Sequence, residues 1–248
     1  MHIYYFSGTG NTYTIASTII ETLRNHQTKA ELIMINSQTE LNNSKDTQSE
    51  PICLLFPINA HAMSPFIWRF IKNLPEGQGR DILVFYTYNS SAAIGEPIQK
   101  ILNRKGYNLR VLKGLQMPNH LIIHEDEIID NQKRYEIGMQ ITTKAIEAYL
   151  NGECLIDFKT DGSKILSFFN RHTSIIWNIM RLFTKLEVQK NKCMDCGHCK
   201  IQCPVSNIIY INGSYQHKNN CQFCMLCMSN CPNKAIRIKD NDKIKLVN

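Results

Sequence analysis

Short apolar runs alternate with stretches of helical periodicity through the first 150 residues of the chain. The apolar runs are His2–Phe6, Glu31–Ile35, Ile52–Phe56, Ile82–Thr87 and Arg110–Gln116. Between and after them, the spacing of apolar residues predicts helices over 11–25, 65–73, 92–105 and 127–150. Because strands and helices alternate in this order, the pattern predicts an α/β domain with a doubly wound parallel sheet and helices on both of its faces.

The first apolar run leads directly into a loop of glycines and hydroxyl side chains, which reads Ser7-Gly8-Thr9-Gly10-Asn11-Thr12 and precedes a predicted helix. Glycines let the backbone approach an anion, and the first amides of a helix point toward it. The loop lacks the lysine of the nucleotide P-loop and the third glycine of the dinucleotide fingerprint. A phosphate held by neutral hydroxyls and amides fits the monoester of FMN, and ordinary turn chemistry is the alternative.

Two more loops should reach the same ligand, because they follow the third and fourth strands at the same edge of the sheet. The candidate residues are Pro57, Asn59, Ala60 and His61 in the first loop and Thr87, Tyr88 and Asn89 in the second. Backbone amides there would bind the carbonyls of a flavin ring, and Tyr88 would stack on it. The alternatives are a plain strand-end aromatic for Tyr88 and a solvated loop histidine for His61, the one weak candidate for a catalytic proton donor.

The last quarter of the chain repeats one cysteine phrase at an offset of 28 residues. The first copy is Cys193-x-x-Cys196-x-x-Cys199-x-x-x-Cys203-Pro204, and the second is Cys221-x-x-Cys224-x-x-Cys227-x-x-x-Cys231-Pro232. Three closely spaced thiolates can cover one face of a cubane cluster, whereas structural zinc prefers two separated ligand pairs. Disulfides would require an oxidising compartment. The repeat therefore predicts two 4Fe–4S clusters, with zinc as the main alternative.

With both signals in one chain, the sequence resembles the fused flavodoxin–ferredoxin family of anaerobic bacteria. Ser7 to Thr12 match the flavodoxin phosphate loop, Thr/Ser-x-Thr-Gly-x-Thr. Further support comes from Phe56-Pro57, Gln116-Met117-Pro118-Asn119 and Asn207-Ile208. The resemblance implies the strand order 2-1-3-4-5, with the ligand beyond the carboxyl ends of the strands, and a small α+β two-cluster ferredoxin domain.

The same resemblance implies crossed ligation, in which the fourth cysteine of each copy binds the cluster of the other copy. One cluster would then use Cys193, Cys196, Cys199 and Cys231, and the other would use Cys221, Cys224, Cys227 and Cys203.

Three parts are expected: a flavodoxin-like FMN domain over 1–152, a helical linker or docking segment over 153–190, and a ferredoxin-like domain over 191–248. Within the second part, Lys164–Leu186 carries apolar residues at helical spacing with basic residues around them. We expect Phe168, Ile176 and Phe183 to dock the cluster domain, and a helix lying on a membrane surface is the alternative.

The formal net charge of +7 lies entirely outside residues 1–150, which hold equal numbers of basic and acidic side chains. Anionic clusters and an FMN phosphate would offset most of this surplus. No basic stripe interleaved with aromatics is present, so nucleic-acid binding is not expected. The sequence contains no run of eighteen apolar residues and leaves no room for a targeting segment before the first strand, so we expect a cytoplasmic protein without a membrane span.

The expected function is that of an iron–sulfur flavoprotein oxidoreductase. Electrons would pass between a redox partner protein, the two clusters and FMN, and then to an acceptor such as a small organic molecule. The alternative is a pure electron carrier between protein partners, without a small-molecule substrate.

Overall fold

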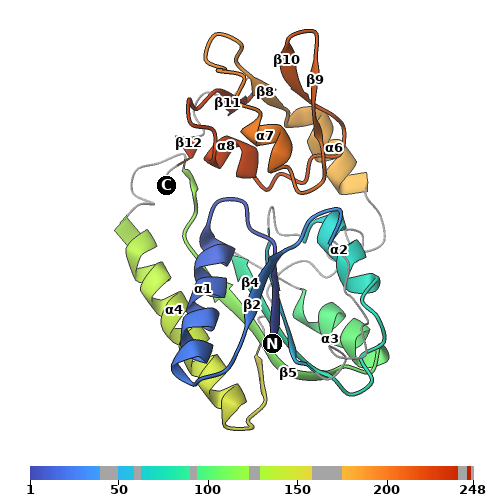
Figure 1. Cartoon of the computed structure of the whole chain (residues 1–248), viewed down its shortest axis with the longest axis vertical. Coiled ribbons are helices and arrows are strands. Elements are labelled where there is room, and N and C mark those ends of the chain that lie inside the picture. The colour runs from blue at the N-terminus through green and yellow to red at the C-terminus, as the bar shows by residue number, and fades with distance from the viewer. Residues whose placement is uncertain are drawn as a thin grey trace.

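A computed structural model describes the chain over residues 1–39, 50–58, 63–89, 94–122, 129–157, 175–239 and 245–246. It consists of a larger N-terminal part and a smaller C-terminal part, which lies over one edge of the N-terminal sheet (Figure 1). The candidate residues Asn59, Ala60 and His61 lie outside the described ranges.

The N-terminal part is built on a six-stranded parallel sheet in the order β2-β1-β3-β4-β5-β7. The strands are β1 (His2–Tyr5), β2 (Glu31–Met34), β3 (Ile52–Pro57), β4 (Asp81–Tyr88), β5 (Asn108–Gln116) and β7 (Leu155–Asp157). The order of the first five confirms the predicted doubly wound sheet of the flavodoxin-like type. The sixth strand, β7, was not predicted, and it extends the sheet beyond residue 152.

Helices cover both faces of this sheet, as predicted (Figure 1). Their bounds are Asn11–Asn25 for α1, Pro65–Lys72 for α2, Gly95–Arg104 for α3 and Ile129–Leu150 for α4. On one face Ile15 and Ile19 of α1 and Ile146 of α4 form a buried core. On the other face Trp68 of α2 and Leu102 of α3 form a second buried core. Neighbouring strand residues point to opposite faces, so buried strands such as β3 contribute apolar side chains to both cores.

The C-terminal part follows the sequence repeat element by element. Its elements are α6 (Ile175–Phe183), β8 (Leu186–Val188), α7 (His198–Ile201), β9 (Ile208–Ile211), β10 (Ser214–His217), α8 (Leu226–Ser229) and β11 (Ile236–Ile238). The starts of β8 and β10, of α7 and α8, and of β9 and β11 are each 28 residues apart. The repeat therefore begins at Leu186, inside the segment predicted as a linker.

Each small sheet of the C-terminal part combines one strand from each copy of the repeat. The first strand of the first copy, β8, pairs antiparallel with β11 of the second copy. The first strand of the second copy, β10, pairs antiparallel with β9 of the first copy. The two copies thus exchange strands, and the loops that carry their cysteines lie against one another.

The helix α6 packs on this repeat through a residue that the sequence reasoning did not single out. Trp177 is fully buried, and its ring stacks on Phe223 with centroids 5.9 Å apart. Met180 packs against the same core. The expectation that Phe183 docks the cluster domain is wrong, because its side chain is 83% exposed. Phe168 and the side chain of Ile176 lie outside the described residues.

Near its end the chain returns to the N-terminal part, where β12 (Lys245–Leu246) pairs antiparallel with β6 (Leu121–Ile122). None of the helices in the described ranges is long and apolar enough to span a membrane.

Candidate functional site

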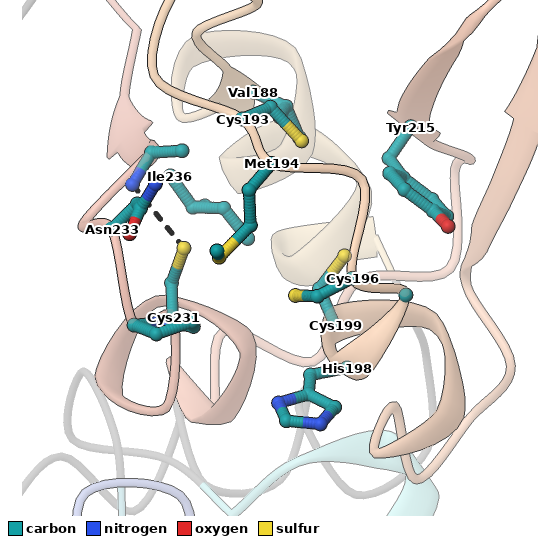
Figure 2. A pocket seen from close by; sticks show the side chains of 13 residues that line it. Val188, Cys193, Met194, Cys196, His198, Cys199, Tyr215, Cys231, Asn233 and Ile236 are labelled. Atoms are coloured by element: carbon teal, nitrogen blue, oxygen red, sulfur yellow. Dashed lines mark hydrogen bonds between the residues drawn. The ribbon is translucent and has the colours of Figure 1, made fainter.

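Four cysteines from both copies of the repeat line one pocket in the C-terminal part (Figure 2). Three of them, Cys193, Cys196 and Cys199, belong to the first copy, and Cys231 is the fourth cysteine of the second copy. Cys203, the fourth cysteine of the first copy, is not among the described residues that line this pocket. The structure therefore brings together the same four thiols that the crossed scheme groups.

Electrostatic coupling also links each fourth cysteine to thiols of the other copy. Burial raises the pKa of Cys199, and Cys193, Cys196 and Cys231 raise it further. In the second copy, burial raises the pKa of Cys224 to about 12, and neighbouring Cys221 and Cys203 add to the shift. Burial likewise raises the pKa of Cys227, with Cys203 among the contributing thiols. Each fourth cysteine thus lies beside the triplet of the other copy, and metal binding would remove these protons outright.

The fourth cysteines are held by matching hydrogen bonds. The backbone N–H of Asn207 donates to Sγ of Cys203 at 3.2 Å, and the N–H of Ala235 donates to Sγ of Cys231 at 3.2 Å. These donors are four residues beyond their cysteines in both copies. N–H bonds to ligand sulfur stabilise the thiolate and influence the potential of a bound cluster.

The backbone conformation around the cysteines also repeats from one copy to the other. Positive φ angles occur at Asp195 and Phe223, at Gly197 and Met225, and at Ser206 and Lys234. Every pair is separated by the repeat offset of 28 residues. Non-glycine residues rarely adopt this conformation, so its recurrence shows that the cysteine spacing imposes one loop geometry on both copies.

The predicted phosphate loop lies in the N-terminal part. The turn between β1 and α1 consists of Ser7, Gly8, Thr9 and Gly10, and the helix begins with Asn11 and Thr12. Gly10 has a φ of 107°, which side-chain-bearing residues rarely adopt, so glycine is required there. The hydroxyl of Ser7 accepts a hydrogen bond from the backbone N–H of Tyr13 at 3.3 Å. The loop is thus a glycine turn at the N-terminus of a 15-residue helix, the geometry that binds phosphate.

Two candidate residues from different strands meet beside this turn. The hydroxyls of Thr12 and Thr87 are 3.0 Å apart, and both residues are buried. The side-chain amide of Asn11 donates to the carbonyl of Pro118 at 2.8 Å. The phosphate loop, the end of β4 and the segment after β5 therefore converge at the carboxyl edge of the sheet.

The remaining candidates for the flavin ring lie at the ends of β3 and β4. Pro57 ends β3, and the N–H of the next residue, Ile58, donates to the carbonyl of Thr87 at 2.7 Å. Tyr88 is buried, with its ring centroid 6.0 Å from that of Tyr86, which favours the alternative of a strand-end core aromatic. Asn89 accepts hydrogen bonds from Gln116 at its carbonyl and from Arg134 at its side chain. Flavin contacts by these residues stay predictions.

His120 is a candidate that the sequence reasoning missed. It is 9% exposed, and its Nε2 lies 2.6 Å from the hydroxyl of Tyr135. Its buried Nδ1 has no hydrogen-bond partner within the described ranges. Burial lowers the pKa of His120, and the nearby backbone of Thr9 opposes that shift. The only signal in the sequence was its place directly after Gln116 to Asn119.

The phosphate loop lies directly against the second cysteine copy. A methyl group added at Gly8 would lie 1.6 Å from the backbone oxygen of Cys224, far inside van der Waals contact. The side chain of Cys224 packs against the core that contains α2 and α3. The side-chain oxygen of Gln222 accepts from the N–H of Phe66 at 3.3 Å, and the N–H of Ser37 donates to the carbonyl of Pro204 at 2.7 Å. A cleft beside these contacts is lined by residues of both parts, among them Arg69, Phe70 and Val205.

The chain is similar in sequence to two ferredoxin-type proteins over about a quarter of its length or less. No protein-family model matches the chain. It is 37% identical over 57 residues to an uncharacterised ferredoxin of Methanocaldococcus jannaschii, which covers 74% of that protein and 21% of this chain. It is 35% identical over 65 residues to the pyruvate synthase subunit PorD of Thermotoga maritima, spanning 62% of that subunit and 25% of this chain.

Among solved structures, a short-chain flavodoxin associated with a bacterial microcompartment aligns with a TM-score of 0.43 at 15% identity. That alignment covers 61% of this chain and 96% of the flavodoxin. A flavodoxin of Megasphaera elsdenii aligns with a TM-score of 0.40 at 20% identity, covering 58% of this chain and 98% of that protein. These scores are too low to carry an argument, so the strand order alone defines the fold of the N-terminal part.

The combination of a flavodoxin-like sheet and a two-copy cysteine domain places this chain in the class of electron-transfer proteins. The chain belongs to the ferredoxin family through its C-terminal part, and that part is fused to an N-terminal domain with the flavodoxin-like fold.

Proposed function

We propose that this protein is an iron–sulfur flavoprotein oxidoreductase with two 4Fe–4S clusters and one FMN. The observation that carries the proposal is the pocket lined by Cys193, Cys196, Cys199 and Cys231, because this set draws on both copies of the repeat. It is the ligand set of a two-cluster ferredoxin with crossed fourth ligands. Cys221, Cys224, Cys227 and Cys203 form the second set, supported by the coupling of their thiols.

The spacing of the cysteines along the chain, three close together and a fourth further on in each copy, favours clusters over zinc. Four thiolates on one zinc ion, each about 2.3 Å from the metal, would lie only about 4 Å apart. Among the described residues, no three His, Cys, Asp or Glu side chains are grouped closely enough to hold a single metal ion. A cubane cluster binds each thiolate through a different iron atom, so its ligands lie farther apart than the ligands of one zinc ion.

The phosphate loop and the residues around it fit FMN. The N-terminus of α1 and the hydroxyls of Ser7, Thr9 and Thr12 would hold the phosphate, and His120 lies beside the backbone of Thr9. Bound FMN would supply two-electron chemistry that connects to the one-electron chemistry of the clusters. The loops after β3 and β4 would hold the ring.

The division into an FMN domain, a helical segment and a cluster domain is part of the same proposal, but β7 moves the first boundary from 152 to beyond Asp157 and the repeat moves the last from 191 to Leu186. We place the protein in the cytoplasm, because eight ligand thiols must stay reduced to bind iron. Its donor would be a low-potential redox protein, and the likeness to a pyruvate synthase subunit supports a partner of that kind.

Anaerobic reduction of the FMN-loaded protein tests the function. A reduced two-cluster ferredoxin should bleach the flavin absorbance, consuming two electrons per FMN. The reduced protein would then be mixed either with small organic acceptors, such as quinones, or with an oxidised flavodoxin. Turnover with an organic acceptor would identify a reductase, and turnover with oxidised flavodoxin but no organic acceptor would identify a carrier. No bleaching of bound flavin would contradict both.

A further inference from the structure

We infer that the two clusters hold fixed places in the electron path: the second-copy cluster faces the flavin, and the first-copy cluster faces the donor protein. This rests on the proposed function and adds the order of transfer to it. It also makes Gly8 and Gln222 positioning residues, which hold the second cysteine copy against the phosphate loop.

The contact at Gly8 carries the inference. The backbone oxygen of Cys224 lies where the Cβ of any other residue at position 8 would have to be. Gly8 does not have the positive φ that would by itself require glycine, so its lack of a side chain is needed for this contact alone. A ligand of the second cluster is therefore in direct contact with the loop proposed to hold the FMN phosphate.

Two further contacts fix the same orientation. Gln222 lies between the ligands Cys221 and Cys224, is fully buried, and accepts from the N–H of Phe66 at the start of α2. Pro204 follows the ligand Cys203 and accepts from the N–H of Ser37 after β2. Two loops and the start of α2 in the N-terminal part thus contact the segments that carry the second cluster's ligands. In Figure 1 the C-terminal part lies over this edge of the sheet.

The cysteine triplet of the first copy is more open to solvent than that of the second copy. Cys196 is exposed, Met194 is 58% exposed, and Ile201 at the end of α7 is 81% exposed. A donor protein can therefore approach the first cluster closely without separating the two parts.

The electrons balance along this route. Each reduced donor would supply one electron to the cluster held by the first triplet, and the second triplet would hold the cluster that receives it next. Two donors would therefore supply the two electrons, and water the two protons, that full reduction of a bound FMN requires.

Stopped-flow mixing with a reduced two-cluster ferredoxin tests the order, using the full-length loaded protein with FMN at saturation. Gly8→Ala and Gln222→Ala should slow bleaching of the flavin by at least about tenfold, because small displacements of redox partners are costly in rate. Freeze-quench EPR should show both clusters reduced at the wild-type rate. Phe183→Ala is the control, since its exposed side chain leaves both rates unchanged.

Cys196→Ala tests the donor side, and it should slow flavin bleaching by the protein donor although the second cluster is retained. Wild-type bleaching rates in Gly8→Ala and Gln222→Ala, or in Cys196→Ala, would overturn the order. If Gly8→Ala fails to hold FMN, Gln222→Ala decides, because it lies outside the phosphate loop. Iron and FMN are counted beforehand. A wild-type protein that contains neither would contradict the proposed function. Flavin bleaching at the wild-type rate in variants that do contain both would contradict only the order of transfer.

Discussion

The two cysteine copies have identical spacing and loop geometry, yet they lie in different surroundings. At equivalent positions, Met194 of the first copy is 58% exposed, whereas Gln222 of the second is 1% exposed. Asp195 is exposed, whereas its counterpart Phe223 stacks on Trp177 in the core. The cysteines thus determine how a cluster is held, and the residues between them determine what the cluster faces.

The largest expected effect concerns the crossed ligands, which make the copies interdependent. Cys196→Ala combined with Cys231→Ala would damage one cluster twice and leave roughly four iron atoms per chain. Cys196→Ala combined with Cys203→Ala would damage both clusters and leave almost none. Iron is counted after anaerobic purification of both double variants. The opposite order of retention would show that each copy binds its own cluster.

The next effect concerns the core that supports both copies. Trp177→Ala should destabilise the C-terminal part by about 3–5 kcal/mol, because it removes a fully buried aromatic side chain. Phe183→Ala, in the same helix, should change stability by less than about 0.5 kcal/mol. The measurement is urea-induced loss of cluster absorbance under anaerobic conditions. Equal effects of the two variants would mean that α6 docks through a different face.

A smaller effect is expected on FMN binding, at the phosphate loop that contacts the second cysteine copy. Thr12→Val should weaken FMN binding by at least about tenfold, since a hydrogen bond to a charged group contributes roughly 1.5–3 kcal/mol. Riboflavin, which lacks the phosphate, should bind the variant almost as well as it binds the wild type. Fluorescence titration measures both affinities. An equal loss for both ligands would indicate that the buried contact between Thr12 and Thr87 supports the fold rather than the phosphate.

The smallest effect follows from exposure alone. Ferricyanide with a chelator should remove iron in two phases, with the first-copy cluster lost before the second, because Cys196 is exposed and Cys224 is packed against the N-terminal core. Cys196→Ala, which lacks an intact first cluster, should show only the slow phase. A single phase in the wild-type protein would mean that the surroundings of the two copies do not govern access.

Much of the fold could be predicted from the sequence, because apolar periodicity reports burial within one element. All five long strands and the four helices around them were predicted close to their observed bounds. The strand β7 was missed because it has only three residues, a half-buried leucine followed by two exposed residues, so no apolar run marks it. Phe183 was assigned to the docking face because it lies opposite the polar residues Asn178 and Arg181 on α6, whereas the helix buries Trp177.

The candidate site was likewise predictable where it depends on local sequence and not where it depends on packing. The cysteine spacing and the glycine turn are local, so the sequence carries them in full. Contacts between the two parts, such as Gly8 with Cys224 and Gln222 with Phe66, depend on how separate elements pack, and no local pattern indicates them. His120 was missed for this reason, because its proximity to Thr9 appears only when β5 and α1 are adjacent.

The central claim is that one chain carries two 4Fe–4S clusters and one FMN. Metal, sulfide and flavin analysis of the anaerobically purified full-length protein tests it most directly. The account predicts about eight iron atoms, about eight sulfides and one FMN per chain. Stoichiometric zinc with little sulfide, or a protein that binds no FMN when it is supplied, would contradict it.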